Sequence, residues 1–276
     1  MPKFRYVVCD VFTGRALEGN QLAVFTDARD IPEEQLQRLA REINFSETVF
    51  VYPAGGDGHA RIRIFTPALE LPFAGHPVLG TAFVLGGPLQ LDELWLETGA
   101  GVVPIRLERD GSRIVFGWMR QPPFSFEPYD QVDALLALLG VEESGLPVEL
   151  YRQGPGHVLV ELTSPAAVAE LKPDMGALRE LNPNGTCCFA RDGEGWKSRV
   201  FVPAHGVDED PATGSAAGPL ALHLARHGRI GFGDEIEIRQ GVEMGRPSTL
   251  YAVARSPEEI EVGGSAVVVA RGEFRL

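Results

Sequence analysis

Two ionisable side chains stand directly before prolines that are well placed to start helices. His76 precedes Pro77, and Asp210 precedes Pro211. Proline suits the first turn of a helix, where its missing N–H costs no hydrogen bond. A polar side chain at that point can be a helix N-cap, the most frequent use of Asp, or part of a site at the helix terminus. In a site, the helix N-terminus favours a neutral His76 imidazole, which can donate or accept a proton.

Each of these two loops also carries a glycine, Gly80 or Gly214, at the start of the expected helix. The first N–H groups of a helix have no partner within the helix and lie at the positive end of its dipole. Glycine lets a ligand come close to the backbone. Two such termini facing one cleft would bind a carboxylate or a developing enolate.

Glu47 is the third candidate for acid–base chemistry. It lies between an expected helix and the apolar segment 48–51. Partial burial at this point would raise the pKa of its carboxyl group toward that of a useful general base. The alternative interpretation is a solvated glutamate at the start of a strand.

Histidines and cysteines are the residues most able to bind a metal. His223 and His227 are four residues apart on one expected helix face, a spacing that can hold a metal ion. No third ligand is obvious, so a solvated helix end is favoured and no metal site is predicted. Cys187 and Cys188 are adjacent and lie outside both loops, which indicates buried thiols.

A repeated segment relates the two loops to each other. Residues 63–68 (RIFTPA) resemble 199–204 (RVFVPA), and residues 76–82 resemble 210–216, with a short indel between the two matches. Chance similarity of two turn–helix starts is the alternative. A duplicated chain would fold as two similar α+β halves, whose loops face each other across a cleft where a ligand commonly binds.

The elements expected to position these residues are short strands and a few helices. Apolar periodicity predicts a helix over 31–44, in which Asp30 and Glu33 resemble a capping box and Asn44 is a plausible end. Further helices are predicted from 77 to about 85, from 131 to 139 and from 211 to about 227, and strands at 6–11, 21–25, 47–52 and 60–65. Residues 121–124 (QPPF) are predicted to connect the halves.

The composition excludes several classes of protein. The chain has 276 residues, 44% of them hydrophobic, which argues against disorder. Its net charge of −13 repels nucleic-acid phosphates and anionic membrane surfaces, so neither is an expected partner. Three cysteines are too few for a secreted disulfide scaffold. There is no long apolar run and no signal-peptide pattern, so we expect a cytoplasmic protein.

Longer motifs carry a resemblance to a known family. They are NFSET at 44–48, RIRIFTP at 61–67, ELPFAGHP at 70–77, EDPATGSA at 209–216 and QGVEMGRPS at 240–248. Together they resemble the PhzF-like isomerases of phenazine biosynthesis, an antibiotic pathway, from about Tyr6 to the C-terminus. The segment 218–227 (GPLALHLARH) is most similar to the phenazine-pathway members of that family.

The resemblance implies the diaminopimelate-epimerase-like fold. This is an α+β fold of two pseudo-symmetric halves, each with a curved, mostly antiparallel sheet around a central helix. The expected halves are residues 1–120, which a C-terminal strand at about 265–276 could complete, and residues 125–264. The active site is expected in the cleft between them.

The resemblance also implies an activity. Such an enzyme isomerises trans-2,3-dihydro-3-hydroxyanthranilate, needs no cofactor and no metal, and is commonly a homodimer. Glu47 matches the catalytic glutamate, which takes a proton from C3 and delivers one to C1, and His76 and Asp210 complete the expected catalytic set. The expected substrate-binding residues are Ser46, Gly75, Gly214 and Ser215.

Two alternatives stay open. One is a related isomerase or epimerase that acts on another small carboxylic acid. The other is a non-catalytic protein of the same fold that binds a small acid. Related amino-acid epimerases use a pair of cysteines on opposing loops, and Cys9, Cys187 and Cys188 all lie outside these loops, which disfavours cysteine-based racemisation.

Overall fold

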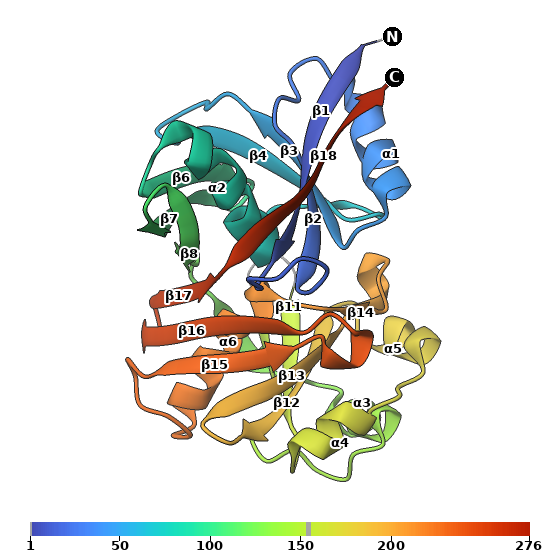
Figure 1. Cartoon of the computed structure of the whole chain (residues 1–276). Coiled ribbons are helices and arrows are strands. Elements are labelled where there is room, and N and C mark those ends of the chain that lie inside the picture. Colours follow the sequence, from blue (N-terminus) through green and yellow to red (C-terminus); the bar gives the residue numbers. More distant parts are fainter. Residues whose placement is uncertain (1, 153–155) are drawn as a thin grey trace.

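Two groups of strands, each curved around one long helix, make up the molecule (Figure 1). The computed structural model describes residues 2–152 and 156–276. The group in the upper part of Figure 1 contains the beginning and the end of the chain and surrounds helix α2 (Gly75–Leu89). The group in the lower part surrounds helix α6 (Gly214–Arg226).

The first group of strands follows the sequence nearly in order. Strand β1 pairs antiparallel with β2, β2 runs parallel to β3, and β3 is antiparallel to β4. The short β5 pairs with β4, which also runs parallel to β6, and β6, β7 and β8 are antiparallel. These strands are β1 Lys3–Val11, β2 Asn20–Phe25, β3 Glu47–Tyr52, β4 Ala60–Phe65, β5 Glu70–Leu71, β6 Glu93–Thr98, β7 Gly101–Asp110 and β8 Arg113–Arg120. The predicted strands at 47–52 and 60–65 are confirmed.

The second group repeats this order of pairings. Strand β10 is antiparallel to β9 and β11, β11 runs parallel to β12, and β12 is antiparallel to β13. The short β14 pairs with β13, which also runs parallel to β15, and β15, β16 and β17 are antiparallel. These strands are β9 Ser125–Pro128, β10 Glu149–Arg152, β11 Gly156–Glu161, β12 Gly185–Asp192, β13 Gly195–Phe201, β14 Glu209–Asp210, β15 Glu235–Gln240, β16 Ser248–Ser256 and β17 Glu259–Gly264. The fold is therefore α+β with two pseudo-symmetric halves.

Two pairings join distant parts of the chain. Strand β17 of the second group pairs antiparallel with β8 of the first, which makes one continuous sheet. The last strand, β18 (Ala266–Arg275), then crosses to the first group and pairs antiparallel with β1, so the two ends of the chain lie side by side (Figure 1). The segment 121–124 connects β8 to β9.

The two central helices are buried on almost every side. In α6, all residues from Gly214 to Ala225 are buried, and α2 is buried from Gly75 to Val84. A helix that is apolar all round belongs inside a core, and each one fills the space enclosed by its curved sheet. None of the helices in the two described ranges is long and apolar enough to cross a bilayer.

The ends of both central helices differ from the prediction. Helix α2 runs beyond the Gly86-Gly87 pair to Leu89, because Gly86 serves close packing rather than termination: a methyl group there would lie 2.5 Å from Leu107. Helix α6 begins at Gly214 with Thr213 as its N-cap, so Asp210 is not the N-cap. In α2 the N-cap is Ala74, and His76 lies inside the first turn.

The internal repeat is present in the structure, but the second parts of its two copies do not match as the sequence motifs were aligned. Leu71 in β5 and Asp210 in β14 occupy equivalent places on β4 and β13. His76 and Ser215 are each the second residue of their helices. The structural counterpart of His76 is therefore Ser215, and not Asp210 as the aligned motifs predict.

The remaining helices cover the outside of the sheets. Helix α1 (Glu33–Ile43) packs on the first group and ends at Asn44 in the left-handed conformation, as predicted. Its N-cap is Pro32 without a side-chain hydrogen bond, so the predicted capping box is wrong. The short helices α3 (Val132–Leu139), α4 (Pro165–Glu170) and α5 (Met175–Leu181) share a second apolar cluster on the other group.

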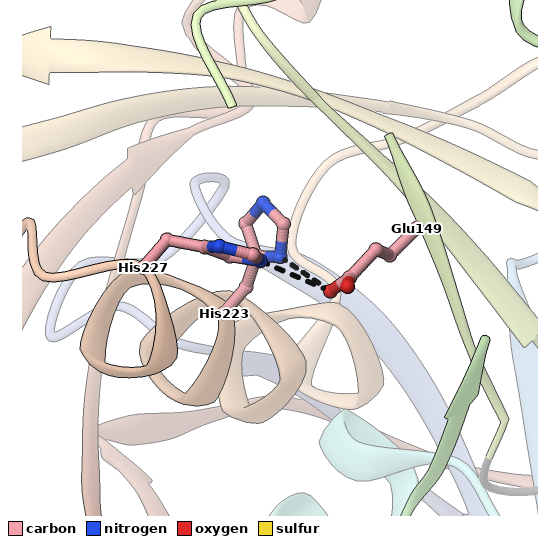
Figure 2. Close-up of side chains that lie close together, drawn as sticks. All are labelled: Glu149, His223 and His227. Carbon is pink, nitrogen blue, oxygen red and sulfur yellow. Dashed lines mark hydrogen bonds and ion pairs between the residues drawn. The ribbon is translucent and has the colours of Figure 1, made fainter. Parts of the chain in front are cut away.

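The predicted solvated end of α6 is wrong, because His223 is fully buried and a third polar group faces it. Glu149 of β10 points at His223 and His227, and its Oε2 lies 3.2 Å from His223 Nδ1 and 3.2 Å from His227 Nε2 (Figure 2). Sequence spacing could not show this, because Glu149 comes from a strand far away in the chain. The three side chains could form a metal site by residue type.

Arg226 already binds the carboxylate oxygen that a metal would need. Its Nη1 donates to Glu149 Oε2 over 2.6 Å, and the Tyr151 hydroxyl donates to the same oxygen over 2.9 Å. Burial by itself would raise the pKa of Glu149, but the hydrogen bonds from Arg226, Tyr151 and His227 hold it at about 2. We interpret the group as an ion-pair network that fastens the end of α6 to β10.

Replacement of Glu149 by Gln should therefore destabilise the protein by about 3 kcal/mol, because it leaves the Arg226 charge without its partner. Urea unfolding at pH 7 measures this loss. The pKa of Glu149 is lowered from 4.5 to about 2, so its contribution is present above pH 4.5 and disappears as the pH falls toward 2.

Asp27→Asn is the matched control. It breaks an ion pair between Asp27 and Arg29, whose side chains are 56% and 62% exposed, so the loss should be much smaller than that of Glu149→Gln. Equal losses for the two variants would contradict the assigned role of Glu149.

Candidate active site

A small cavity lies near the N-termini of α2 and α6, between the two groups of strands. Its volume is about 30 Å³, which is room for about one water molecule. Its walls are formed by Ser46, Glu47, Thr66, Leu71, Ala74, His157, Val202, His205, Val207, Asp210, Thr213 and Ser215. Four of the predicted site residues, Ser46, Glu47, Asp210 and Ser215, are therefore brought together.

Gly75 and Gly214 hold the two helix N-termini against each other. A methyl group on Gly75 would lie 2.7 Å from Cα of Gly214 and 2.9 Å from the backbone nitrogen of Ser215. Only glycine permits this approach, because the obstructing atoms are backbone and cannot move aside. The positive ends of two helix dipoles consequently meet beside one cavity, which favours an anionic ligand.

Gly80 has a different environment from the one predicted for it. A methyl group there would lie 2.7 Å from both Leu22 and Val11, so Gly80 packs in the core on β1 and β2. The glycine of the first loop that faces the second loop is therefore Gly75.

Glu47 and His76 form a close, buried pair. Glu47 is the first residue of β3, and its Oε2 lies 3.3 Å from Nε2 of His76, in the first turn of α2. Both atoms are buried, and within the described ranges neither makes a well-aligned hydrogen bond. The carboxyl group consequently keeps an oxygen available for a proton transfer.

The pKa values of this pair move in opposite directions. Burial raises the pKa of Glu47 well above 4.5, and the nearby Asp210 charge adds to this effect. Burial lowers the pKa of His76 to about 3, although a hydrogen bond to the backbone of Gln21 partly opposes it. The pair therefore holds its proton on Glu47 rather than on His76, as a carboxyl group with acid and base roles requires.

Asp210 approaches from the second group and is fixed by neighbours from both groups. Its Oδ1 accepts a 2.8 Å hydrogen bond from Nδ2 of Asn20, and its Oδ2 accepts a 2.6 Å bond from the Thr213 hydroxyl. Burial raises the pKa of Asp210, while hydrogen bonds from Thr213, Ser46 and Asn20 oppose this shift. Asp210 thus couples the loop before α6 to strand β2.

Three amides that the sequence reasoning missed hold this arrangement in place. Asn20 Nδ2 also donates to the carbonyl oxygen of Ala212 over 2.9 Å and lies 3.1 Å from His76 Nδ1. Gln240 Nε2 donates to the carbonyl oxygen of Asp210 over 2.7 Å. Gln121 Nε2 donates to the carbonyl oxygen of Gly214 over 2.8 Å.

Position in a motif was the only sequence signal for these amides. Gln240 begins the QGVEMGRPS segment and Gln121 begins the connector QPPF, whereas nothing in type or spacing marked Asn20. Two histidines of the cavity wall, His157 and His205, were missed as well, because nothing in their type or spacing marked them. Cys9, Cys187 and Cys188 are all buried and lie outside the cavity wall. The prediction of buried thiols is confirmed.

The arrangement can take a proton from a small organic acid and return it. A carboxyl group with a raised pKa lies beside a cavity, and paired helix N-termini beside it can bind an anion. Asp210 and His76 supply further hydrogen-bonding groups around Glu47.

Comparison with known proteins gives one consistent family. A model of phenazine biosynthesis-like proteins matches residues 9–272. The chain is 52% identical to trans-2,3-dihydro-3-hydroxyanthranilate isomerase of Pseudomonas aeruginosa, over 99% of each chain, and 49% identical to the enzyme of the same name from Pseudomonas fluorescens, over 98% and 99%.

Solved structures agree with the fold. A phenazine biosynthesis protein of the PhzF family from Bacillus anthracis superposes with a TM-score of 0.84 at 26% identity, over 100% of both chains. A hydroxyproline epimerase from Agrobacterium vitis superposes with a TM-score of 0.69 at 15% identity, over 98% of this chain and 92% of the epimerase, which indicates a shared fold alone. The chain belongs to the PhzF family of phenazine biosynthesis-like proteins.

Proposed function

We propose that this protein is an isomerase that converts trans-2,3-dihydro-3-hydroxyanthranilate in phenazine biosynthesis. Glu47 takes the proton from C3 of the substrate ring and returns a proton to C1, so the double bonds move along the ring and no cofactor is consumed. The curated relatives named for this reaction, at 52% and 49% identity over nearly the whole chain, support the choice of substrate.

The observation that carries the proposal is the buried carboxyl group of Glu47 beside the cavity. Its pKa is raised by burial, its Oε2 faces a neutral imidazole, and a second carboxyl group, Asp210, lies close enough to raise its pKa further. A general base works best when its pKa approaches the working pH, and burial shifts Glu47 in that direction.

The N-termini of α2 and α6 supply the second requirement, a place for the substrate carboxylate. Gly75 and Gly214 bring these termini into contact, and Ser46 and Ser215 add hydroxyl groups at the cavity wall. We assign substrate binding to these four residues, and we assign His76 and Asp210 to the support of Glu47 during proton transfer.

The cavity volume adds a condition for turnover. A space for about one water molecule is smaller than a six-membered ring with three substituents. The proposed halves, residues 1–120 with 265–276 and residues 125–264, must therefore move apart to admit the substrate. The proposal also includes a homodimer, which the family resemblance suggests and which sedimentation of the purified protein tests, and a cytoplasmic location.

Glu47→Gln should lower kcat by about 10³-fold while the fold is retained, because the amide keeps the shape and cannot carry the proton. Incubation of the purified protein with trans-2,3-dihydro-3-hydroxyanthranilate in heavy water, followed by NMR, measures substrate loss and deuterium uptake.

Glu42→Gln is the control for this experiment, since Glu42 is an exposed glutamate on α1 and its loss should leave turnover unchanged. Near-normal turnover by Glu47→Gln would refute the role of Glu47. Tight binding without conversion by the wild type would favour a binding protein, and neither binding nor conversion would favour another small acid.

The pH dependence should report the raised pKa of Glu47. The free base is the reactive form, so kcat/KM should rise with pH through an apparent pKa well above 4.5. A profile that is already flat above pH 5 would contradict a buried glutamate as the base.

Stability should change in the opposite sense. The folded state holds the Glu47 proton where the unfolded chain releases it, so the free energy of unfolding falls as the pH rises above 4.5. Glu47→Gln removes this effect and should unfold at a higher urea concentration than the wild type at pH 8. The difference should shrink at pH 5.

Gly75→Ala should destabilise the protein by about 1–3 kcal/mol and reduce turnover, because the added methyl group forces the two helix N-termini apart. Urea unfolding and the turnover assay measure the two effects. The matched control is Gly87→Ala in the same helix, where no described atom outside the neighbouring residues and the helix's own backbone lies within 4 Å of the added methyl group. That variant should keep full turnover.

A further inference from the structure

The side chain of His157 packs against a glycine in the second group of strands. It lies near the start of β11 and pairs in register with Gly185 of the parallel strand β12. A methyl group on Gly185 would collide with Nδ1 of His157. The imidazole therefore lies over the bare backbone of Gly185, and a larger residue at Gly185 would displace it from the cavity wall.

The equivalent pair in the first group is Leu22 and Glu47. They pair between the parallel strands β2 and β3. Relative to the pairing with the following strand, β4 or β13, they have the same register as His157 and Gly185. A leucine thus fills this position in the first half, so packing alone does not require an imidazole. The second half has a glycine where the first half has its buried carboxyl group.

Within the described residues the His157 imidazole makes one hydrogen bond, and its partner belongs to the proposed site. Its Nε2 lies 2.9 Å from Oγ of Ser215, and both side chains are buried. Nδ1 is buried too and has no hydrogen-bond partner in the described part of the chain. Burial, with a smaller effect from His205, lowers the pKa of His157 to about 3, so the ring is neutral at neutral pH.

A neutral imidazole carries its proton on one nitrogen only. On Nδ1, that proton would be a buried donor without an acceptor, and such donors are rare. On Nε2, it points at Ser215 Oγ and leaves an unpaired acceptor, which is less costly. The tautomer with the proton on Nε2 therefore fits this site better, and His157 is the donor to Ser215.

The hydrogen bond from His157 determines where the Ser215 hydroxyl group can donate its own hydrogen. With one lone pair of Oγ taken by His157, the Ser215 hydroxyl hydrogen is left to point into the cavity. Ser215 lies in the first turn of α6, beside Gly214 and opposite Gly75, where an anion is favoured. A chain of two donors, from imidazole to hydroxyl to anion, strengthens each bond in it.

We propose that His157 is a positioning residue, which donates Nε2–H to Ser215 and thereby aims the serine hydroxyl at the carboxylate of the substrate. The inference rests on the proposed function only in that the ligand is a small carboxylic acid. His157 itself takes no part in the proton transfer at C3 and C1.

The first test compares His157→Leu with His157→Gln. Leucine is the residue at the equivalent position of the first half, and glutamine keeps an N–H near the position of Nε2. Calorimetry measures the binding of anthranilate, an aromatic acid that cannot be isomerised in this way. Affinity should fall about tenfold or more in His157→Leu and return to within about threefold of the wild type in His157→Gln.

In the turnover assay, KM should rise in His157→Leu and return close to the wild-type value in His157→Gln. The kcat should be nearly unchanged in both variants, because the carboxylate is held equally in ground and transition states. Anthranilamide, which has no carboxylate, should bind equally to the wild type and to His157→Leu. Unchanged anthranilate binding in His157→Leu would overturn the proposal, as would an equal loss in both variants or no binding by the wild type.

The second test asks whether His157 acts through Ser215. Ser215→Ala should weaken anthranilate binding, and adding His157→Leu should weaken it no further. If the two substitutions lower the affinity for anthranilate by independent factors that multiply in the double variant, the proposed chain of hydrogen bonds is overturned. Urea unfolding of each variant checks that the fold is retained.

The wild type provides a test that needs no variant. In ¹⁵N NMR of histidine-labelled protein, the His157 ring should be neutral with the proton on Nε2 and a bare Nδ1. A proton on Nδ1 would overturn the proposal even where His157→Leu does not fold.

These tests separate this inference from the proposed function. A wild type that binds anthranilate through His157 and does not convert trans-2,3-dihydro-3-hydroxyanthranilate contradicts the proposed function alone. A wild type that converts it, with binding and KM unaffected by His157→Leu, contradicts the role of His157 alone.

Discussion

Direct contact between the backbones of Gly75 and Gly214 is the constraint on which the rest of the structure depends. Two helices can approach end to end this closely only if neither has a side chain at the point of contact. The surrounding amides serve the same contact, since Gln121 holds Gly214 from the connector and Asn20 bridges Asp210 and Ala212 from β2. The cavity and its charge preference follow from where these helices begin.

The two halves are alike in topology and unlike in chemistry. Equivalent register positions carry Leu22 and Glu47 in one half and His157 and Gly185 in the other. One half therefore brings a buried carboxyl group, which we propose moves the proton, and the other brings a neutral ring, which we propose orients a hydroxyl group. The burial that raises the pKa of Glu47 also lowers the free energy of unfolding at alkaline pH, and the large apolar cluster shared by both halves offsets this cost.

Local patterns were enough for much of the fold. Alternation and turn residues predicted β3 and β4, and helical periodicity with an Asn44 end predicted α1 within two residues. Glycine proved ambiguous, because Gly86 and Gly80 serve packing inside α2, while Gly75 lets the two central helices meet end to end. Contacts between residues distant in the sequence could not be predicted: Glu149 meets His223, and His157 meets Ser215, only where helix α6 packs against β10 and β11. The repeat led to the right architecture and to the wrong partner for Asp210, because the loop lengths of the two halves differ.

The pairing of the first strand with the last sets an order on synthesis. Lys3–Val11 is synthesised long before Ala266–Arg275, the strand that covers one of its two edges. Until Ala266–Arg275 has been made, the earlier strand presents an open sheet edge, which is the kind of surface that nascent chains aggregate through. The strands between these two find their partners sooner, so β1 is fully paired only after they have been made.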